Sequence, residues 1–193
     1  YGNDGNTTLT LHGTDVDNLG TIIGQADVVD YATTLTFVDS ANISGATVTN
    51  VQTVNEMGTG QTLSLGIGGF TSTNYNTIYS DDVGNTLNLV GTINADLTNT
   101  SIQYFDYIDT AMGDHQITVD AGTIYDNWNV TWSGDSTTNF WFTESYNASN
   151  WTLTQGDFGD IYLSDYVDLI VNQTFLSNSI LFQVGTTNTL TIN

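Results

Sequence analysis

Aspartate supplies most of the groups in this sequence that could bind a ligand or do chemistry. It outnumbers glutamate 19 to 2, and its densest cluster lies at 157–168, where Gly-Asp turns can present carboxylate and carbonyl oxygens together. Calcium takes roughly six to eight such oxygens, so Ca²⁺ is the cofactor that the sequence suggests. The alternative is that these aspartates form Asx turns on solvated loops. The predicted metal ligands are Asp157, Asp160, Asp165, Asp168, Asp106 and Asp109.

Catalytic chemistry has little support in the sequence. His12 and His115 are the only histidines, and neither lies in a nucleophile motif of the kind that accompanies a Ser-His-Asp site. Glu56 and Glu144 are the only glutamates, and no pair of carboxylates stands out as the acid and base of a glycosidase. We therefore expect that the protein is not an enzyme.

The charge balance excludes several classes of partner. The 193-residue chain has no lysine or arginine, and its formal net charge is -21 at pH 7. Nucleic-acid backbones and anionic lipid surfaces attract basic side chains, so we expect no nucleic-acid partner. There is also no apolar run of about 20 residues, so we expect no membrane insertion.

A charge of this size repels itself in water of low ionic strength. Bound calcium, high salt or acid would relieve the repulsion. Only 11% of the residues are charged, and glutamate is rare. This composition is unlike that of a salt-loving protein, and it favours calcium or acid.

Apolar residues recur at every second position, which is typical of strands with one buried face. In the second half of the chain such pairs follow one another about every ten residues. Helical periodicity is nearly absent, and there is no proline to interrupt strand pairing. The sequence therefore predicts an all-β protein with no significant helix. The pairs are Val130/Trp132, Phe140/Phe142, Trp151/Leu153, Ile161/Leu163, Leu169/Val171, Ile180/Phe182 and Leu190/Ile192.

An internal repeat indicates how these strands are organised. A shift of 54 residues places 41–70 on 95–124 without a gap, and a Thr-Leu-x-(Leu/Phe) motif begins at Thr8, Thr34, Thr62 and Thr86. We distinguish a repeat-containing β region, 1–124, from an aromatic-rich β region, 125–193, that continues it. A β-solenoid with one coil per 24–28 residues and a β-sandwich or jelly roll with a duplicated motif both fit. The repeat favours the solenoid slightly for 1–124.

Aromatic residues are concentrated in the second region. Trp132, Phe140, Phe142 and Trp151 follow the two-residue period and are predicted to lie in the core. Trp128 and Trp141 fall in the opposite phase and are predicted to lie on the surface. Exposed tryptophan stacks on sugars or packs in subunit interfaces, so these two residues are candidates for glycan stacking.

Asn-x-Ser/Thr sequons occur about as often as chance predicts in a chain so rich in these residues, so their number is no argument for glycosylation. Their use depends on the host. The candidate acceptors are Asn6, Asn42, Asn99, Asn129, Asn147, Asn150 and Asn172.

Both termini read as strands, at 7–11 and 188–192. Terminal strands offer unpaired backbone groups to another chain, and neither lysine nor proline blocks these two. The alternative is that both strands only complete the sheets of their own domain. The predicted contacts with copies of the same chain are Thr8, Leu9, Leu11, Leu190 and Ile192.

The stretches 41–54 and 61–66 resemble the low-complexity repeats of bacterial S-layer and RTX-type surface proteins. That resemblance implies a secreted protein that often depends on calcium, although the Gly-Gly-x-Gly-x-Asp calcium repeat of the RTX type is absent. The composition also resembles that of the Thr/Asn-rich subunits of archaeal surface filaments. In those filaments a β-domain can join its neighbour by donating a terminal strand.

Together these features predict a structural subunit of an extracellular cell-surface assembly, either a filament or an S-layer, whose partners are copies of itself. The competing hypothesis is a carbohydrate-binding or adhesin module that uses the aromatic-rich second region and binds glycans.

Overall fold

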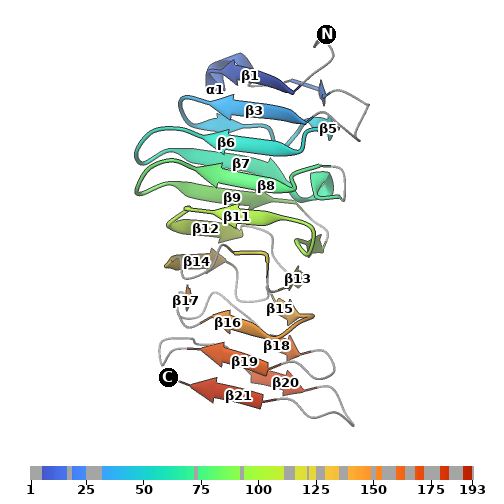
Figure 1. Ribbon diagram of the computed structural model, residues 1–193, viewed down its shortest axis with the longest axis vertical. Helices are drawn as coiled ribbons and strands as arrows, with labels where there is room; N and C mark the ends of the chain where they lie inside the picture. The colour runs from blue at the N-terminus through green and yellow to red at the C-terminus, as the bar shows by residue number, and fades with distance from the viewer. Residues whose placement is uncertain are drawn as a thin grey trace.

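The strands of this protein stack in parallel into a β-solenoid. The computed structural model describes residues 6–16, 19–24, 32–71, 74–91, 94–110, 116–120, 122–124, 129–134, 139–148, 151–153, 160–163, 168–171, 179–182 and 189–192. All pairings between the described strands are parallel, and the strands follow one another down the long axis (Figure 1). The solenoid prediction is confirmed. The sandwich and jelly-roll alternatives are wrong because both are built from antiparallel sheets.

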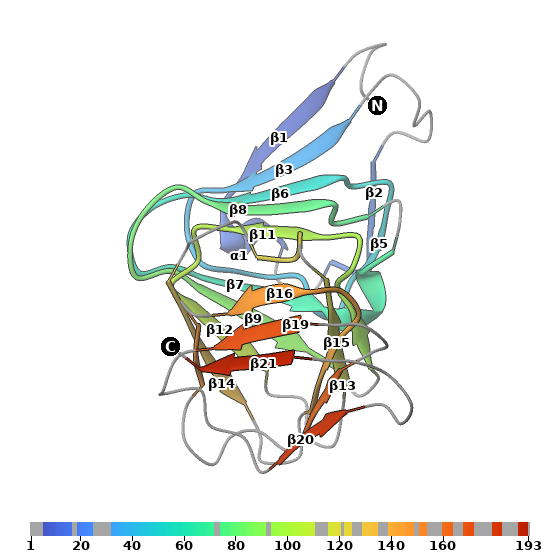
Figure 2. The same cartoon turned by 60° about the horizontal axis from the view of Figure 1, so that its bottom comes forward.

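Three long sheets form the sides of the solenoid, and Figure 2 shows them around a shared interior. The first sheet contains, in spatial order, β1 (Thr7–Leu11), β3 (Thr33–Phe37), β6 (Thr53–Glu56), β8 (Thr77–Ser80) and β11 (Ser101–Gln103). The second contains β4 (Ala41–Asn42), β7 (Thr62–Gly66), β9 (Thr86–Val90), β12 (Tyr107–Thr110), β14 (Val130–Gly134) and β17 (Trp151–Leu153). The third contains β10 (Ala95–Asp96), β13 (Gln116–Val119), β15 (Asn139–Phe142), β18 (Asp160–Leu163) and β20 (Ser179–Phe182).

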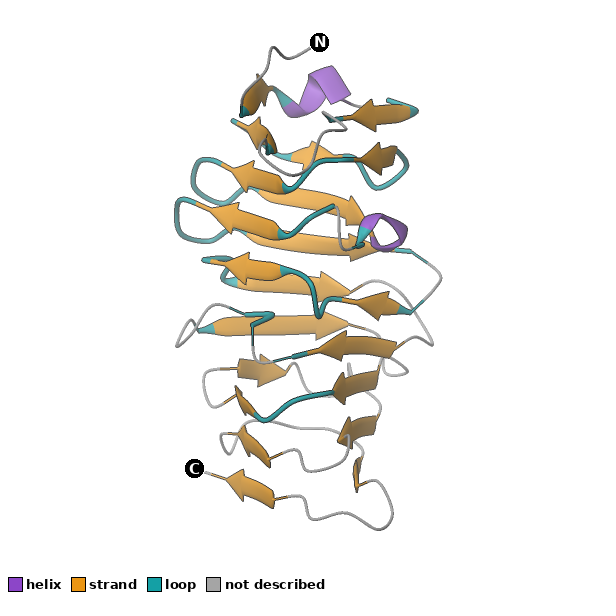
Figure 3. Ribbon diagram, turned by 45° about the vertical axis from the view of Figure 1, so that its right-hand side comes forward, coloured by secondary structure: helices purple, strands orange, loops and turns teal. Residues whose placement is uncertain are grey.

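Two smaller sheets and two short helices complete the described structure. One sheet joins β16 (Tyr146–Ala148), β19 (Asp168–Val171) and β21 (Thr189–Ile192), and the other joins β2 (Thr21–Ile23) and β5 (Thr47–Thr49). The helices are α1 (Gly13–Val16) and the 3₁₀ turn η1 (Ile67–Gly69), drawn in purple in Figure 3. Both the second and the third sheet contain strands from before and after residue 124.

The two-residue period of the sequence builds the interior. In a strand, alternate side chains point to opposite faces, so every second residue of each strand joins an apolar column that runs along the axis. In the first sheet, Leu35 pairs with Val54, Val54 with Ile78 and Ile78 with Ile102, and all four are at most 2% exposed. The outward positions carry Thr, Ser, Asn and Gln instead, and these residues are compatible with both strands and water.

Aromatic rings fill the interior towards the C-terminal end. Trp132, Phe140, Phe142 and Trp151 are all at most 1% exposed, which confirms the prediction that they lie in the core. The Trp132 ring centroid lies 5.1 Å from that of Phe140, in an edge-to-face arrangement, and 5.1 Å from that of Trp151. Such pairs add about 0.5–1.5 kcal/mol beyond the burial of their area. The cluster therefore joins the second sheet to the third.

The 54-residue repeat reflects corners of the solenoid rather than whole coils. Asn42 on β4 belongs to the second sheet, whereas its repeat partner Asp96 on β10 belongs to the third. The corner chemistry is nevertheless the same. Asn42 Oδ1 accepts bonds from the N–H and hydroxyl of Ser44 at 3.0 and 2.7 Å. Asp96 Oδ1 accepts the equivalent bonds from Thr98 at 3.1 and 2.7 Å. The shift thus advances the chain by one side of the solenoid.

Candidate functional site

The corner loops between the first and second sheets gather most of the described polar contacts between successive coils. These loops are 38–40, 57–61, 81–85 and 104–106, and we call their stack the corner column. The stack begins at His12, directly after β1. Because each loop bonds to the next, the column holds carboxylates at fixed positions along one edge of the molecule.

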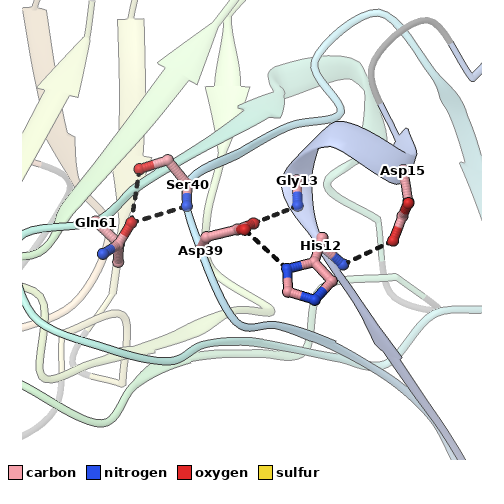
Figure 4. Close-up of polar contacts among 6 residues, drawn as sticks. All are labelled: His12, Gly13, Asp15, Asp39, Ser40 and Gln61. Carbon is pink, nitrogen blue, oxygen red and sulfur yellow. Dashed lines mark hydrogen bonds and ion pairs between the residues drawn. The ribbon is translucent and has the colours of Figure 1, made fainter.

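His12 and Asp39 contact each other at the start of the corner column (Figure 4). His12 Nδ1 lies 2.9 Å from Asp39 Oδ2, and the N–H of Gly13 donates to Asp39 Oδ1. The Gly13 N–H, followed by His12, lowers the pKa of Asp39, and the bond to Asp39 raises the pKa of His12. The hydroxyl of Ser40 donates to Gln61 Oε1, 3.0 Å away. The bonds described here therefore form an ion pair in water, not a serine–histidine pair.

The two longest loops of the corner column pair with each other residue by residue. The N–H of Gly58 donates to Asp81 Oδ1 at 2.8 Å, and the hydroxyl of Thr59 donates to Asp82 Oδ2 at 2.5 Å. The bond from Thr59, and then the N–H of Val83, lower the pKa of Asp82. Both aspartates are exposed, so these bonds orient charged groups that remain in contact with solvent.

Glu56 is a carboxyl group inside the solenoid, at the last position of β6. It is 0% exposed, and neither of its side-chain oxygens has a hydrogen-bond partner among the described residues. Burial, and then the nearby charges of Asp39 and Asp81, raise the pKa of Glu56 to about 8. An ionised carboxylate without partners is costly to bury, so the protonated form is the one that fits this position.

The predicted metal ligands do not come together in the described part of the chain. Asp106 accepts a bond from the N–H of Gly84 in the corner column, whereas Asp109 lies on β12 and accepts from the hydroxyl of Ser133 at 3.2 Å. Asp160 begins β18, and its N–H donates to Asn139 at 2.6 Å. Within the described ranges no group of three His, Asp or Glu side chains is placed to hold a metal ion.

The rest of the 157–168 cluster is only partly described. Asp168 begins β19, where the backbone pairs with Thr189. Asp157 and Asp165 lie outside the described residues. Calcium binding by this cluster therefore stays a prediction.

Four of the sequon asparagines are exposed: Asn6, Asn42, Asn99 and Asn129. Asn147 lies on β16, opposite Ile170 of β19. Two of the four exposed asparagines have described side-chain or backbone roles, since Asn6 Oδ1 accepts from the N–H of Ala32 and Asn42 closes the corner described above. Asn150 and Asn172 lie outside the described ranges.

Trp141 lies on the outer surface of the third sheet, in agreement with its predicted phase. It is 38% exposed, and its neighbours in register are Thr118 on β13 and Tyr162 on β18. An indole at the surface beside a second aromatic residue offers an apolar face next to a hydroxyl group. Trp128 lies outside the described residues.

The predicted contact strands are both edge strands. β1 is the outermost strand of the first sheet, and β21 is an outermost strand of its three-stranded sheet. Leu9 pairs with Leu35 in the interior column but is 48% exposed, whereas Leu35 is 1% exposed. Leu11 pairs with Phe37 and is only partly buried. On β21, Thr189 and Thr191 are exposed, and Leu190 and Ile192 pair with Leu169 and Val171.

The sequence interpretation missed the corner column and the buried Glu56. Glu56 could have been found, because it lies two positions after Val54 and so shares its inward phase. The column could not, because its partners come from successive coils whose spacing varies: Thr34 pairs with Thr53, but Thr53 pairs with Thr77.

No family model, curated protein or solved structure matches this chain. Within the described residues, no helix has the length and apolar character needed to cross a membrane.

Proposed function

We propose that this protein is a structural subunit of an extracellular cell-surface assembly, a filament or an S-layer, whose copies join through the edge strands β1 and β21. The observation that carries the proposal is the relation between these two strands. Figure 1 shows β16, β19 and β21 below β11, on the same side of the solenoid and with their arrows pointing the same way as those of the first sheet. A second copy stacked end to end would therefore continue one sheet in parallel.

The backbone of β1 is suited to this contact. The N–H of Thr7 donates to Ala32, and the carbonyl of Leu11 accepts from Val38, so the residues at odd positions face β3. In a parallel strand the intervening residues direct their N–H and C=O groups the opposite way, so Thr8 and Thr10 face the open edge. A head-to-tail contact of this kind does not close on itself and so builds a filament.

The experiment removes one donor from the open edge. Thr10→Pro deletes the outward N–H and leaves the β1–β3 bonds in place, because proline is tolerated at sheet edges. Thr10→Ala is the matched control, since it shortens the side chain but keeps the N–H. Light scattering and electron micrographs should show polymers for the wild type and Thr10→Ala and short species for Thr10→Pro. Polymers of equal length in all three proteins would refute edge pairing through β1.

A second function, carbohydrate binding, is supported by the exposure of Trp141 alone. In this case Trp141→Ala should abolish retention on a glycan array. Tyr107→Ala is the control, because Tyr107 is 47% exposed but lies on the second sheet. Equal retention of both variants and the wild type, or no retention of any, would count against a glycan site at Trp141.

A further inference from the structure

The corner column changes its width at one point. The loops 57–61 and 81–85 contain five residues each, whereas the next loop, 104–106, contains three. The two longer loops project together at the left of Figure 1, and the corner between β11 and β12 lies further back. A shorter loop stacked on a longer one leaves a recess beneath the overhang.

The recess has a volume of about 280 Å³. Its lining comes from the end of β8, the loop that follows it, and the start of the shorter loop. The lining residues are Tyr79, Ser80, Asp81, Asp82, Val83 and Tyr104. One wall is therefore aromatic and aliphatic, and the other carries two carboxylates.

The aromatic wall consists of two tyrosines from successive coils. The ring centroids of Tyr79 and Tyr104 lie 5.4 Å apart with an interplanar angle of 79°, an edge-to-face contact. Tyr104 has φ 63, a backbone conformation that is uncommon for a residue with a side chain. Val83 is 61% exposed beside them. Together these groups offer an apolar surface and the electron-rich face of an aromatic ring to a ligand.

The acidic wall is held in place before any ligand arrives. Both oxygens of Asp82 accept bonds, one from the Thr59 hydroxyl and one from the N–H of Val83, 2.8 Å away. Asp81 accepts from the N–H of Gly58. The lowered pKa of Asp82 keeps its carboxylate charged in weak acid. The sequence contains no lysine or arginine, so no side chain of this chain other than a histidine can neutralise the pair.

We propose that this recess binds a primary alkylammonium group, with the ammonium between the two carboxylates and the tyrosine rings and the alkyl chain against Val83. Cations bind the faces of aromatic rings, and charge-assisted hydrogen bonds to carboxylates are stronger than neutral ones. A calcium ion would gain nothing from the aromatic wall, and it needs roughly six to eight oxygen ligands, whereas the two carboxylates here supply four oxygens, three of which already accept bonds.

The ammonium could belong to a free diamine or to the lysine side chain of another protein. It cannot belong to a lysine of a second copy, because the chain has none. The site is therefore independent of the proposed self-assembly, and a monomeric variant such as Thr10→Pro should keep it.

The experiment measures binding of n-butylammonium by calorimetry and by shifts of backbone amide resonances at pH 7 and low salt, with 1-butanol as the neutral comparison. Asp81→Asn combined with Asp82→Asn should weaken butylammonium binding about tenfold. Asp96→Asn combined with Asp109→Asn is the matched control, because it removes the same charge from residues outside the recess and should weaken binding by less than about twofold. Asparagine retains a carbonyl acceptor for the Gly58, Thr59 and Val83 bonds, and the melting temperature of each variant shows whether it folds.

Tyr104→Asn tests the aromatic wall separately, since asparagine accepts a positive φ. It should weaken binding about threefold without changing net charge. The proposal is overturned by equal binding of 1-butanol, by equal losses in the two double variants, or by the absence of saturable butylammonium binding. Comparison of 1,4-diaminobutane with Nα-acetyl-lysine methylamide then separates the two sources, since the diamine is favoured only by a site for small molecules.

Discussion

Glu56 directly follows Phe37 in the interior column of the first sheet, and both side chains are completely buried. The next position in the column is Ser80, which is also 0% exposed. The column thus changes from apolar to polar at the point where β6 enters the longest corner loop. A carboxyl group placed there makes the stability of the solenoid depend on pH.

We expect the free energy of unfolding to fall as the pH rises from about 4.5 to about 8. The pKa of Glu56 is raised to about 8 in the folded protein from 4.5, so in this window the folded state holds a proton that the unfolded chain releases. Stability is fully present below the lower value and is lost at up to roughly 1.4 kcal/mol per pH unit until the upper value is reached. Urea unfolding between pH 5 and 9 measures this slope.

Glu56→Gln should remove most of that slope and raise stability at pH 8, because the amide is neutral throughout. Glu144→Gln is the control, since Glu144 is exposed and is the only other glutamate. If Glu56→Gln leaves the slope unchanged between pH 5 and 8, the pH dependence has another origin.

The ion pair at the start of the corner column makes a separate prediction. Asp39 raises the pKa of His12, so Asp39→Asn should lower the pKa of His12, and proton resonances of the imidazole ring report that pKa directly. In the wild type the protonated histidine favours the folded state, so this contribution is present below the unfolded pKa and is lost as the pH rises through the folded one.

Asp15→Asn provides the comparison for His12. Asp15 raises the pKa of His12 only as the last of several causes, and its carboxylate accepts from the backbone N–H of His12 at 3.0 Å rather than from the ring. The shift in Asp15→Asn should therefore be much smaller than the shift in Asp39→Asn. Equal shifts would mean that net charge, and not the contact with Asp39, sets the pKa.

The all-β class and the buried aromatic residues could be predicted because both follow from local alternation. Trp132 and Trp141 differ in phase, and the structure places one in the core and the other on the surface. The sheet to which each strand belongs could not be predicted in the same way. Corner loops of three or five residues change the spacing between paired strands, so Asn42 and Asp96 match in sequence but lie on different sheets.

The recess at Tyr79 and Tyr104 was also invisible in the sequence. Tyr79 occupies an outward position on β8, and Tyr104 follows β11, so 24 residues of backbone separate two rings that touch. Thr77 pairs with Ser101 in register, and only this pairing shows that the two tyrosines occupy neighbouring coils. The difference in loop length that opens the recess gains meaning only once the loops are known to stack.

The phase of the tryptophans leads to a prediction about stability. Trp132→Ala should cost about 3–5 kcal/mol, the usual loss when a large buried aromatic side chain is truncated, since Trp132 contacts both Phe140 and Trp151. Trp141→Ala should cost less than about 1 kcal/mol, because the side chain is partly solvated. Urea unfolding followed by circular dichroism measures both values. Similar losses in the two variants would contradict the assignment of Trp141 to the outer surface.

The net charge of -21 and the absence of lysine and arginine predict that calcium stabilises the protein beyond its effect on ionic strength. Millimolar Ca²⁺ at pH 7 should raise the melting temperature by several degrees relative to NaCl at equal ionic strength, because a ligand that binds only the folded state stabilises it by mass action. Excess EDTA should reverse the shift. Asp160→Asn combined with Asp168→Asn should reduce the shift if the 157–168 cluster binds the ion, whereas Asp96→Asn combined with Asp120→Asn removes equal charge elsewhere and should leave it nearly intact. Identical melting curves in Ca²⁺ and matched NaCl would show that screening alone relieves the repulsion.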